Sequence, residues 1–408
     1  MSLSKRSVDP AHRGRRNRAD KRRLRKVPFF KGLMRCSMRK LLSVFFVLLI
    51  GASFVHAEST LEPSYFPSLI SSIRINTPLS FCDEDVPLDN REVLERLEKE
   101  LLITLSDRTQ VILWIKRSNR YMPYIEEMLN ENDMPEDLKY VAIIESALRP
   151  HAGSRKGAIG FWQFMKETGL NYGLTIDKYK DERRNIFSST KAAINYLRAL
   201  YADFGSWTLS AAAYNMGEDR LKSEIQEQKA HNYYKLYLSI ETQRYMLRII
   251  AAKLILSDPE KYGFILNEDD LYPPLQFDPI YLTLSQRVPI HIIAQSAGTY
   301  FKAIKDLNPE LRGHYIREGT HSILVPKGSA VDFHPRFEKA LTEWSLENKE
   351  RTYLVKRGDN LTLIAERFNV SLQDLLIWNN LKPRNHIHPG DQLIVYMGEK
   401  PQDAGIKK

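Results

Sequence analysis

Apolar and polar positions follow two different patterns along this 408-residue chain. From residue 91 to about residue 257, apolar residues recur at intervals of three and four, and Gly or Pro interrupts them, as in amphipathic helices. Ser188 and Ser189 are suited to cap a helix over 190–204, which Gly205 would end. This region is therefore predicted to be all-α.

Two similar units of strand, helix, helix and strand follow residue 274. At an offset of 71, which becomes 70 after a one-residue deletion, the matched positions are Ile293 and Ile364, Ile304 and Leu375, Asn308 and Asn379, and 323–325 and 393–395. A unit of about 46 residues buries only a thin core. Its small size favours a binding surface over an active site. The alternative is that a unit serves only as a spacer, which applies especially to the first unit.

The net charge of +10 is concentrated at the start of the chain. Residues 1–40 carry a net charge of +13 and the remainder −3, so the body of the protein is nearly neutral and nucleic-acid binding is not expected. An apolar run, 41–55, follows and ends near Ala57. This is the layout of a secretory signal peptide. The run is short for a membrane helix, which needs about 20 residues, although an uncleaved anchor and a true start at Met38 remain open.

Cysteine use limits the chemistry of the chain. Cys36 precedes the apolar run, so Cys82 would be alone after cleavage, with no internal disulfide and no cysteine-based metal site. A bacterial lipoprotein needs a Cys at the end of the apolar run, and this chain has none there. We therefore expect export without lipidation.

Glu145 is the most informative candidate for chemistry. In the helix predicted over 135–148, it shares a face with Leu138, Val141 and Leu148. A carboxylate on an apolar stripe either finds a partner or has its pKa raised, and a raised pKa suits a general acid near neutral pH. A Glu paired with Arg or held by backbone is the ordinary alternative.

The segments after Glu145 combine glycines, aromatic rings and amides. Three glycines fall within 151–160, so the backbone there can approach a ligand closely. Trp162 and Gln163 follow, and Tyr214 and Asn215 end an otherwise small-residue helix. Aromatic rings and amides complement the faces and hydroxyls of sugars. Taken separately, Trp162 or Tyr214 is more typical of a core residue.

These residues resemble, in order, the signature of the soluble-type lytic transglycosylases, which share the goose-type lysozyme fold. The resemblance covers roughly 120–255. Its motifs are Glu145-Ser146-Ala147, Ser154, Gly157-Ala158, Gly160-Phe161-Trp162-Gln163, Ala213-Tyr214-Asn215 with Gly217, and Glu241-Thr242 with Tyr245. Trp162 departs from the Met that is common in the family, which is expected to change the packing of a sugar subsite and not the chemistry.

The resemblance implies a role for each matched residue. Glu145 would be the sole acid and base. The substrate-binding residues would be Ser154, Trp162, Gln163, Tyr214, Asn215, Glu241 and Tyr245. The substrate would be peptidoglycan, cut between N-acetylmuramic acid and N-acetylglucosamine without water to leave 1,6-anhydro ends. No metal and no organic cofactor is expected.

Ordinary glycosidases need two carboxyl groups. No second acid lies beside Glu145 in a comparable motif, although Asp177, Asp181 or Glu241 could fold near it. Two other interpretations therefore remain, a hydrolase on the same fold and an inactive peptidoglycan-binding scaffold.

The second repeat resembles LysM, which implies binding of glycans that contain N-acetylglucosamine. The residues implied to bind are Gly358, Asp359, Asn360, Leu361, Leu381 and Ile387. The first repeat has 287–290 where the second has 358–361. Without Gly and Asp it loses the tight turn, so it is interpreted as a degenerate unit.

The predicted fold class is mainly α, a lysozyme-like helical domain followed by small α+β (βααβ) LysM-type units. The predicted organisation is a signal peptide with a basic extension (1–57), a lead-in linker (58–90), the catalytic domain (91–265), a degenerate LysM-like unit (275–330), a linker (331–350), a LysM domain (351–397) and a tail (398–408). The expected location is the periplasm or cell envelope, with membrane association only through an uncleaved signal.

Overall fold

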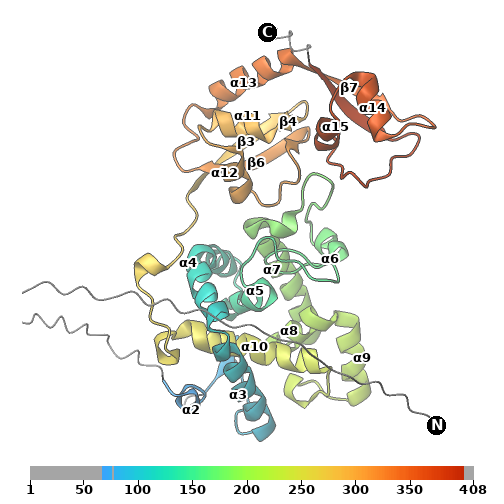
Figure 1. Cartoon of the computed structure of the whole chain (residues 1–408). Helices are drawn as coiled ribbons and strands as arrows, with labels where there is room; N and C mark the ends of the chain where they lie inside the picture. Colours follow the sequence, from blue (N-terminus) through green and yellow to red (C-terminus); the bar gives the residue numbers. More distant parts are fainter. Residues whose placement is uncertain (1–66, 76–77, 399–408) are drawn as a thin grey trace, which may run out of the picture. The chain divides into compact units, whose positions relative to one another are not determined.

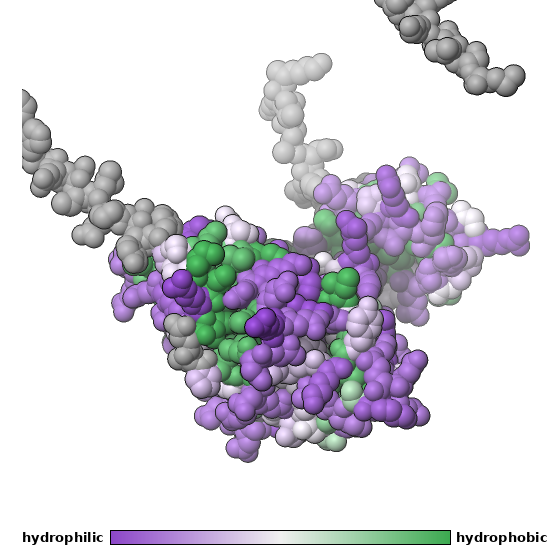
Figure 2. Space-filling view, turned by 90° about the horizontal axis from the view of Figure 1, so that it is seen from below, coloured by the Kyte–Doolittle hydropathy of each residue, from purple (hydrophilic) through white to green (hydrophobic). Residues whose placement is uncertain are grey.

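The structure is a computed structural model that describes residues 67–75 and 78–398. The predicted signal peptide and nearly all of the predicted tail lie outside these residues. Among the described residues, no helix has both the length and the apolar character needed to cross a membrane. The face in Figure 2 is mostly polar, with apolar groups gathered in limited patches.

The first part of the described chain is a helical domain, shown from blue to yellow in Figure 1. Its elements are α2 (Leu69–Ser72), β1 (Ser80–Phe81), β2 (Glu84–Asp85), α3 (Arg91–Ser106), α4 (Arg108–Asn130), η1 (Glu136–Leu138), α5 (Lys139–Ser146), α6 (Lys166–Asn171), η2 (Glu182–Arg184), α7 (Ile186–Phe204), α8 (Trp207–Met216), α9 (Glu218–Gln228), η3 (Tyr233–Lys235), α10 (Ile240–Ser257), η4 (Glu260–Tyr262) and η5 (Glu268–Asp270). The predicted helical domain is confirmed.

Helix α10 is the central element of this domain. It packs against α3, α5 and α8, and its buried residues include Ile249 and Ile250. Ser239 caps its N-terminus by accepting a hydrogen bond from the backbone N–H of Thr242. Because α5 and α8 both contact α10, side chains that lie about 100 residues apart in the sequence meet at one place.

Two predicted helix ends are wrong. Helix α7 begins at Ile186, because Asn185 caps it by accepting from the N–H of Ser188, so Ser188 and Ser189 lie inside the helix. Gly205 ends the helix in the left-handed conformation, as predicted. Helix α5 ends at Ser146, two residues short of the predicted end.

The predicted lead-in linker, 58–90, is wrong for its second half. Residues 79–86 form the β1–β2 hairpin, and Phe81 is fully buried in the core of the helical domain. Glu84 accepts hydrogen bonds from Ser206 Oγ at 2.9 Å and from the N–H of Thr208 at 3.0 Å, which caps α8. These partners lie more than 120 residues away, so local periodicity could not indicate them.

The first repeat is an α+β unit, here named the first LysM-type unit (277–326). It contains β3 (Phe277–Leu284), β4 (Val288–Pro289), α11 (Ile290–Ser296), α12 (Phe301–Leu307), β5 (Tyr315–Ile316) and β6 (Gly319–Pro326). Strands β3 and β6 are antiparallel, with Ile280 opposite Ile323. The outer strands and the two helices follow the predicted βααβ order, and β4 and β5 add a short antiparallel pair that was not predicted.

The second repeat has the same order. It contains β7 (Asn348–Leu354), α14 (Leu361–Phe368), α15 (Leu372–Trp378) and β8 (Gln392–Gly398), and β7 and β8 are antiparallel. Between the repeats, the predicted linker at 331–350 is wrong, because α13 (Phe333–Glu347) occupies most of it. Phe333 is fully buried against the core of the first unit.

Candidate active site

Glu145 lies in the last turn of α5, on the side that faces α10. The side chain is half-buried, and Tyr245 Oη of α10 donates a hydrogen bond of 2.5 Å to Glu145 Oε1. Tyr245 itself is only 2 % exposed. Tyr245, which the resemblance implied as a substrate-binding residue, thus contacts Glu145, and this contact depends on the packing of α5 against α10.

The pKa of Glu145 is raised to about 7, mainly because burial disfavours its charged form. The hydrogen bond from Tyr245 and the charge of Arg248 act in the opposite direction, while Glu241 raises the pKa further. A carboxyl group with this pKa is present in both protonation states near neutral pH. It can therefore donate and accept a proton in one reaction cycle.

The ordinary interpretation of Glu145, an ion pair with Arg, is not what the described residues show. Arg248 lies near enough to affect its pKa, but the guanidinium binds Glu241, with Nη1 2.9 Å from Oε1. Glu241 is exposed. Of the three acids that could fold near Glu145, Glu241 is the one that affects its pKa, but the charge of Glu241 is balanced by Arg248.

The other two candidate partners of Glu145 have structural contacts. Asp181 is 1 % exposed and forms a two-pronged ion pair with Arg183. Asp177 accepts hydrogen bonds from the N–H groups of Tyr179 and Lys180. Neither affects the pKa of Glu145.

Tyr214 and Asn215, at the end of α8, form hydrogen bonds with the Gly-rich segment and with α10, respectively. Tyr214 Oη donates to the carbonyl of Trp162 at 2.7 Å, and Asn215 Oδ1 accepts from Thr242 Oγ1 at 3.1 Å. Burial and the nearby charge of Glu145 raise the pKa of Tyr214, so its phenol stays protonated. Both side chains are half-buried, and the effect of the Glu145 charge on the pKa of Tyr214 shows that Tyr214 lies near the candidate acid.

The segment 152–164, here named the Gly-rich loop, carries three further predicted residues. Ser154 is exposed, and its Oγ accepts from the N–H of Ala158 at 3.0 Å. Gln163 Nε2 donates to the carbonyls of Ala152 at 3.1 Å and Gly160 at 2.8 Å, so its amide closes the loop. Ser154 keeps an open side, whereas the amide N–H of Gln163 already has partners.

Trp162, like Tyr245, is a predicted site residue whose side chain is buried, but it forms no hydrogen bond with Glu145. It is fully buried, and its Nε1–H donates to Thr190 Oγ1 of α7 at 2.9 Å. A large ring with a satisfied N–H in the core cannot stack on a sugar without rearrangement. The core alternative therefore describes Trp162 better than the predicted subsite role.

Left-handed backbone is concentrated next to these residues. Ala147 and Leu148, directly after α5, have φ values of 53° and 54°, and Gln163 has a φ of 49°. Non-glycine residues rarely adopt this conformation, and such strain is frequently found at functional sites. The left-handed conformation of Ala147 ends α5 at Ser146, one residue after Glu145.

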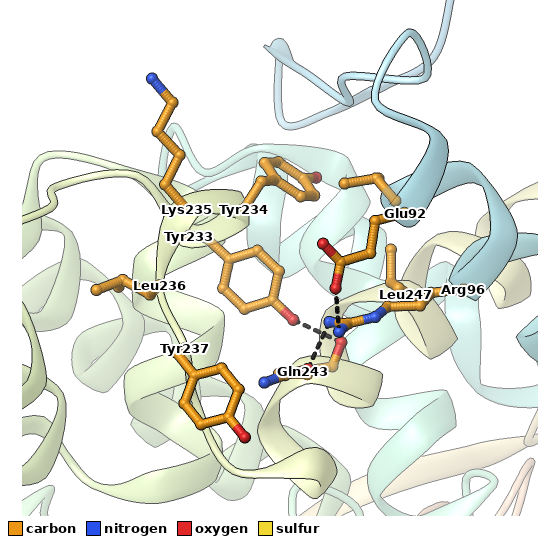
Figure 3. A pocket seen from close by; sticks show the side chains of 10 residues that line it. Glu92, Arg96, Tyr233, Tyr234, Lys235, Leu236, Tyr237, Gln243 and Leu247 are labelled. Carbon is orange, nitrogen blue, oxygen red and sulfur yellow. Dashed lines mark hydrogen bonds and ion pairs between the residues drawn. The ribbon is translucent and has the colours of Figure 1, made fainter. Parts of the chain in front are cut away.

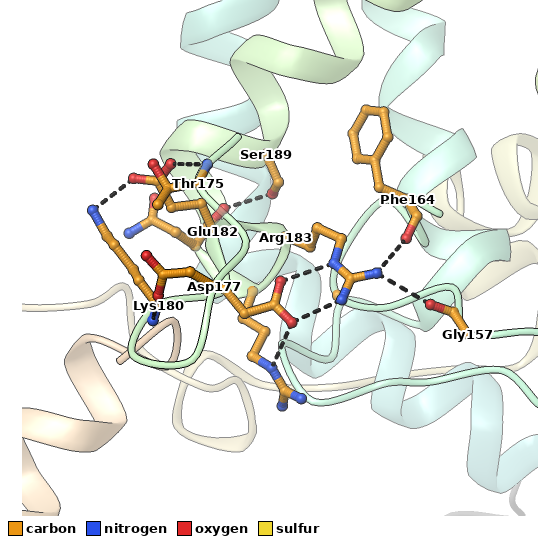
Figure 4. A network of polar contacts seen from close by, with 12 residues as sticks. Gly157, Phe164, Thr175, Asp177, Lys180, Glu182, Arg183 and Ser189 are labelled. Atoms are coloured by element: carbon orange, nitrogen blue, oxygen red, sulfur yellow. Dashed lines mark hydrogen bonds and ion pairs between the residues drawn. The ribbon is translucent and has the colours of Figure 1, made fainter. Parts of the chain in front are cut away.

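A buried polar network behind the Gly-rich loop was not predicted from the sequence. Arg183 Nη1 donates to the carbonyls of Gly157 and Phe164, each at 3.1 Å (Figure 4). Asp181 holds the guanidinium from the other side through both carboxylate oxygens. A Cβ at Gly160 would lie 1.7 Å from the carbonyl oxygen of Arg183, so only glycine fits there. The charged run at 181–184 was a signal that could have drawn attention to this turn.

A groove of about 440 Å³ lies on the second repeat, between the two loops that the resemblance indicated. Four of the six predicted residues line it, namely Asp359, Asn360, Leu361 and Ile387. Gly358, with a φ of 90°, forms the turn beside it, and Leu381 packs on the unit's core. Leu363, Leu372 and Leu376 also line the groove and were missed.

Asp359 has a structural role in this groove. Its Oδ2 accepts from Tyr353 Oη at 2.6 Å and from the N–H of Lys356 at 2.8 Å, and Arg367 approaches Oδ1 at 3.2 Å. The hydrogen bond from Tyr353, with the other donors, lowers the pKa of Asp359. Asn360 Oδ1 accepts from the N–H of Leu363 and caps α14.

A separate pocket of about 160 Å³ lies between the start of α3, the segment 233–237 and α10 (Figure 3). Arg96 crosses it and binds both Glu92 and Gln243. Its lining residues do not include Glu145 or its partners, so this pocket does not belong to the candidate site.

Comparisons with known proteins agree with these observations. The family model for "Transglycosylase SLT domain" matches residues 122–237, and the model for "LysM domain" matches residues 353–395. This chain contains a transglycosylase SLT domain and a LysM domain. The resemblance inferred from the motifs is thereby confirmed, and Glu145, Trp162 and Tyr214 all lie within the SLT domain.

The chain is similar to the membrane-bound lytic murein transglycosylase D of Escherichia coli strain K12, with 32 % identity over 300 residues. The aligned region covers 70 % of this chain and 65 % of that relative. The peptidoglycan transglycosylase gp16 of Escherichia phage T7 is 35 % identical over 132 residues, 31 % of this chain and 10 % of that protein. A crystal structure of the soluble lytic transglycosylase SLT70 from Escherichia coli aligns with 43 % of this chain and 32 % of its own, at 16 % identity and a TM-score of 0.32.

Proposed function

We propose that this protein is a peptidoglycan lytic transglycosylase in which Glu145 is the only acid and base. The observation that carries the proposal is the position of Glu145 in an SLT domain, where Tyr245 Oη donates to it at 2.5 Å and no guanidinium of the described residues is bound to it; its burial there raises its pKa to about 7. The similar proteins from Escherichia coli and phage T7, which are named as transglycosylases of murein or peptidoglycan, support the same substrate.

The proposed reaction begins with protonated Glu145. It gives its proton to the glycosidic oxygen between N-acetylmuramic acid and N-acetylglucosamine, and the bond from C1 to that oxygen breaks. The 2-acetamido group of the substrate stabilises the positive charge at C1. Glu145, now ionised, takes the proton from the C6 hydroxyl as that oxygen bonds to C1, so a 1,6-anhydro ring forms and no water is consumed.

The pKa near 7 suits both halves of this cycle. A group with an ordinary carboxyl pKa would be ionised at neutral pH and could not start the reaction, whereas a much higher pKa would make it a poor acid. Tyr245 would hold the ionised oxygen after the first proton transfer. Tyr214, kept neutral, and Asn215 would keep the end of α8 beside the sugar.

A hydrolase on the same fold is the first rival. A retaining or inverting hydrolase uses a second carboxylate at a defined separation from the acid. Glu241 is the carboxylate that affects Glu145, and it is exposed and paired with Arg248. This pairing favours the single-carboxylate mechanism, although the products decide the question.

We further propose that the LysM domain holds glycan strands that contain N-acetylglucosamine in its groove. The groove lies between the two loops implied by the LysM resemblance, and apolar side chains on both helices offer a surface for sugar faces. We also propose export to the periplasm or cell envelope through the basic and apolar start of the chain, with peptidoglycan as the partner.

The test is mass spectrometry of the muropeptides that the purified full chain releases from sacculi, compared with Glu145→Gln. Wild type should release 1,6-anhydro products, and Glu145→Gln should be slower by at least about 10³-fold. Glu227→Gln, on the exposed surface of α9, is the matched control and should act like wild type. Reducing ends without anhydro ends would establish the hydrolase, and inactivity of wild type would favour the scaffold. Equal rates for wild type and Glu145→Gln would remove Glu145 as the catalyst.

The raised pKa also predicts how stability depends on pH. Glu145 titrates near 4.5 in the unfolded chain and near 7 in the folded chain. Between these values the folded state keeps a proton that the unfolded state releases, so the free energy of unfolding falls as pH rises. Glu145→Gln removes this cost and should be more stable than wild type above pH 7, by up to about 3 kcal/mol. Urea unfolding measures the difference, which should vanish below the unfolded pKa.

A further inference from the structure

The first LysM-type unit makes backbone contacts with the helical domain. Residues 177–181 of the helical domain run antiparallel to 310–312, with Lys180 opposite Leu311. The N–H of Asp181 donates to the carbonyl of Glu310 at 2.8 Å, and the N–H of Arg312 donates to the carbonyl of Tyr179 at 2.7 Å. The two domains therefore share a short β-bridge.

Side chains extend this contact around Asp177. Arg312 Nη1 donates to its carbonyl oxygen at 2.9 Å, and Arg317 Nη1 lies 3.1 Å from its Oδ2. Glu310 is only 2 % exposed, and burial raises its pKa. The contact thus excludes water from polar groups on both sides.

The same segment continues into the turn that supports the Gly-rich loop. Asp181, whose N–H is held by Glu310, binds Arg183 through both carboxylate oxygens, and Arg183 holds the carbonyls of Gly157 and Phe164 (Figure 4). Three consecutive contacts therefore connect the first LysM-type unit to the loop that carries Ser154 and closes at Gln163.

In the first unit, the region equivalent to the LysM groove is used for contacts within the protein. Val288 pairs with Ile316 between β4 and β5, and Lys305 stands at the position of Leu376. The Lys305 ammonium binds the carbonyl of Leu311 and lies 3.4 Å from that of Gly313. These interactions occupy the equivalent of a glycan groove.

Arg287 takes part in this inward arrangement. It stands where the LysM domain has Gly358, and it is 5 % exposed. Its guanidinium carbon lies 5.4 Å from the ring centre of Tyr179 in the helical domain and 4.9 Å from that of Tyr315. Arg287 replaces the glycine of the tight turn in a LysM loop, and it contacts the 177–181 segment instead.

We propose that the first LysM-type unit is a positioning element of the active site and not a glycan-binding unit. It holds 177–181 in place, and the Asp181–Arg183 pair passes this constraint to the Gly-rich loop. The consequence for catalysis rests on the proposed function. Asp181 and Arg183 are positioning residues, which set the loop geometry for sugar binding without contacting the sugar.

The test compares two double variants of the full chain. Arg312→Ala/Arg317→Ala removes both side-chain contacts to Asp177. Lys302→Ala/Lys327→Ala is the matched control, because it removes two cations and two ion pairs from exposed positions within the same unit and directly after it. Hydrogen exchange is followed for the amides of 152–164 and of α10, and kcat and KM are measured on glycan strands.

The expected result for Arg312→Ala/Arg317→Ala is exchange of 152–164 that is faster by roughly tenfold, with α10 unchanged. KM should rise severalfold while kcat changes by less than about twofold, because the loop binds and Glu145 is untouched. The control should match wild type in all measurements.

A second variant, Arg312→Pro, also removes the N–H that donates to Tyr179. Unchanged exchange of 152–164 in both this variant and the double variant overturns the proposal. Equally fast exchange in α10 also overturns it, because the contact would then support the whole fold. Hydrogen exchange needs no activity, so an inactive wild type would refute the proposed function and leave this test valid.

Discussion

The first LysM-type unit and the LysM domain share one scaffold and present it to different surroundings. In each, a buried Asn after the second helix fixes the last strand. Asn308 Nδ2 donates to the carbonyls of Ile304 and Leu324, and its Oδ1 accepts from the N–H of Leu324 at 2.8 Å. Asn379 makes the same three bonds with Leu375 and Ile394.

The two units differ where the first helix begins. In the LysM domain, Asn360 caps α14 and Asp359 gathers three donors, which leaves an open groove beside the loop. In the first unit, Pro289 precedes α11 without a side-chain cap, and the chain there pairs with β5. The core and the Asn therefore set the scaffold in both units, and the loop before the first helix decides whether an open groove or a contact within the protein forms beside it. The LysM domain contacts the helical domain elsewhere, where Asn380 Nδ2 donates to the carbonyl of Lys178 at 2.7 Å.

The largest expected effect comes from removing the buried Asn of the LysM domain. Asn379→Ala leaves buried backbone groups unpaired at a cost of roughly 3 kcal/mol or more, which a unit of this size cannot offset. We expect exchange protection of β8 to be lost and sacculus binding to fall to the level of a chain that ends before β7.

Asn308→Ala, with the same lost bonds, is the matched variant. The β-bridge to 177–181 gives the first unit additional support, so β6 should keep most of its protection from exchange. Equal loss of protection in the two units would contradict the difference that we infer between them.

The scaffold shared by the two units could be predicted from the sequence, because matched positions of the repeat make the same contacts in both units. The offsets of 71 and 70 aligned Asn308 with Asn379 and Leu324 with Ile394, and the hydrogen bonds follow this alignment atom by atom. Helix α13 also had a signal, since Phe333, Phe337, Ala340 and Trp344 recur at helical spacing. The prediction of a linker over 331–350 did not use this spacing.

The chemistry of the candidate site could be predicted from the sequence, whereas the contacts that hold its residues in place could not. Glu145 on an apolar stripe indicated either a partner or a raised pKa, and the ordered motifs indicated Tyr245 as a residue of the same site, whereas its hydrogen bond to Glu145 was not predicted. The burial of Trp162 depends on Thr190, and the constraint on the Gly-rich loop depends on contacts with residues 310–312. Such long-range contacts leave no periodic trace in one sequence.

A smaller effect is expected from the apolar surface of the groove. Leu363 and Leu372 line it from both helices and are 45 % and 37 % exposed. Leu363→Ala/Leu372→Ala should weaken sacculus binding by about tenfold, because two exposed contact side chains are lost with little change in stability. Leu354→Ala, at an exposed position outside the groove, is the control.

Phe301→Ala tests the equivalent position of the first unit, because Phe301 aligns with Leu372 and stacks on His314 within its own unit. Its sacculus affinity should equal that of wild type. Weaker binding would show that the first unit also holds glycan.

The smallest expected effect concerns the cap of α14. Asn360→Ala removes the acceptor for the N–H of Leu363 and should lower the free energy of unfolding of the LysM domain by about 1 kcal/mol, whereas Asn360→Asp keeps an acceptor and should cost only a few tenths. Hydrogen exchange of the α14 amides measures both. Pro289→Ala, at the uncapped start of α11, should leave exchange in that helix nearly unchanged. If Pro289→Ala instead exposes α11 as much as Asn360→Ala exposes α14, the start of the helix has the same importance in both units, and the loop difference cannot explain their separate roles.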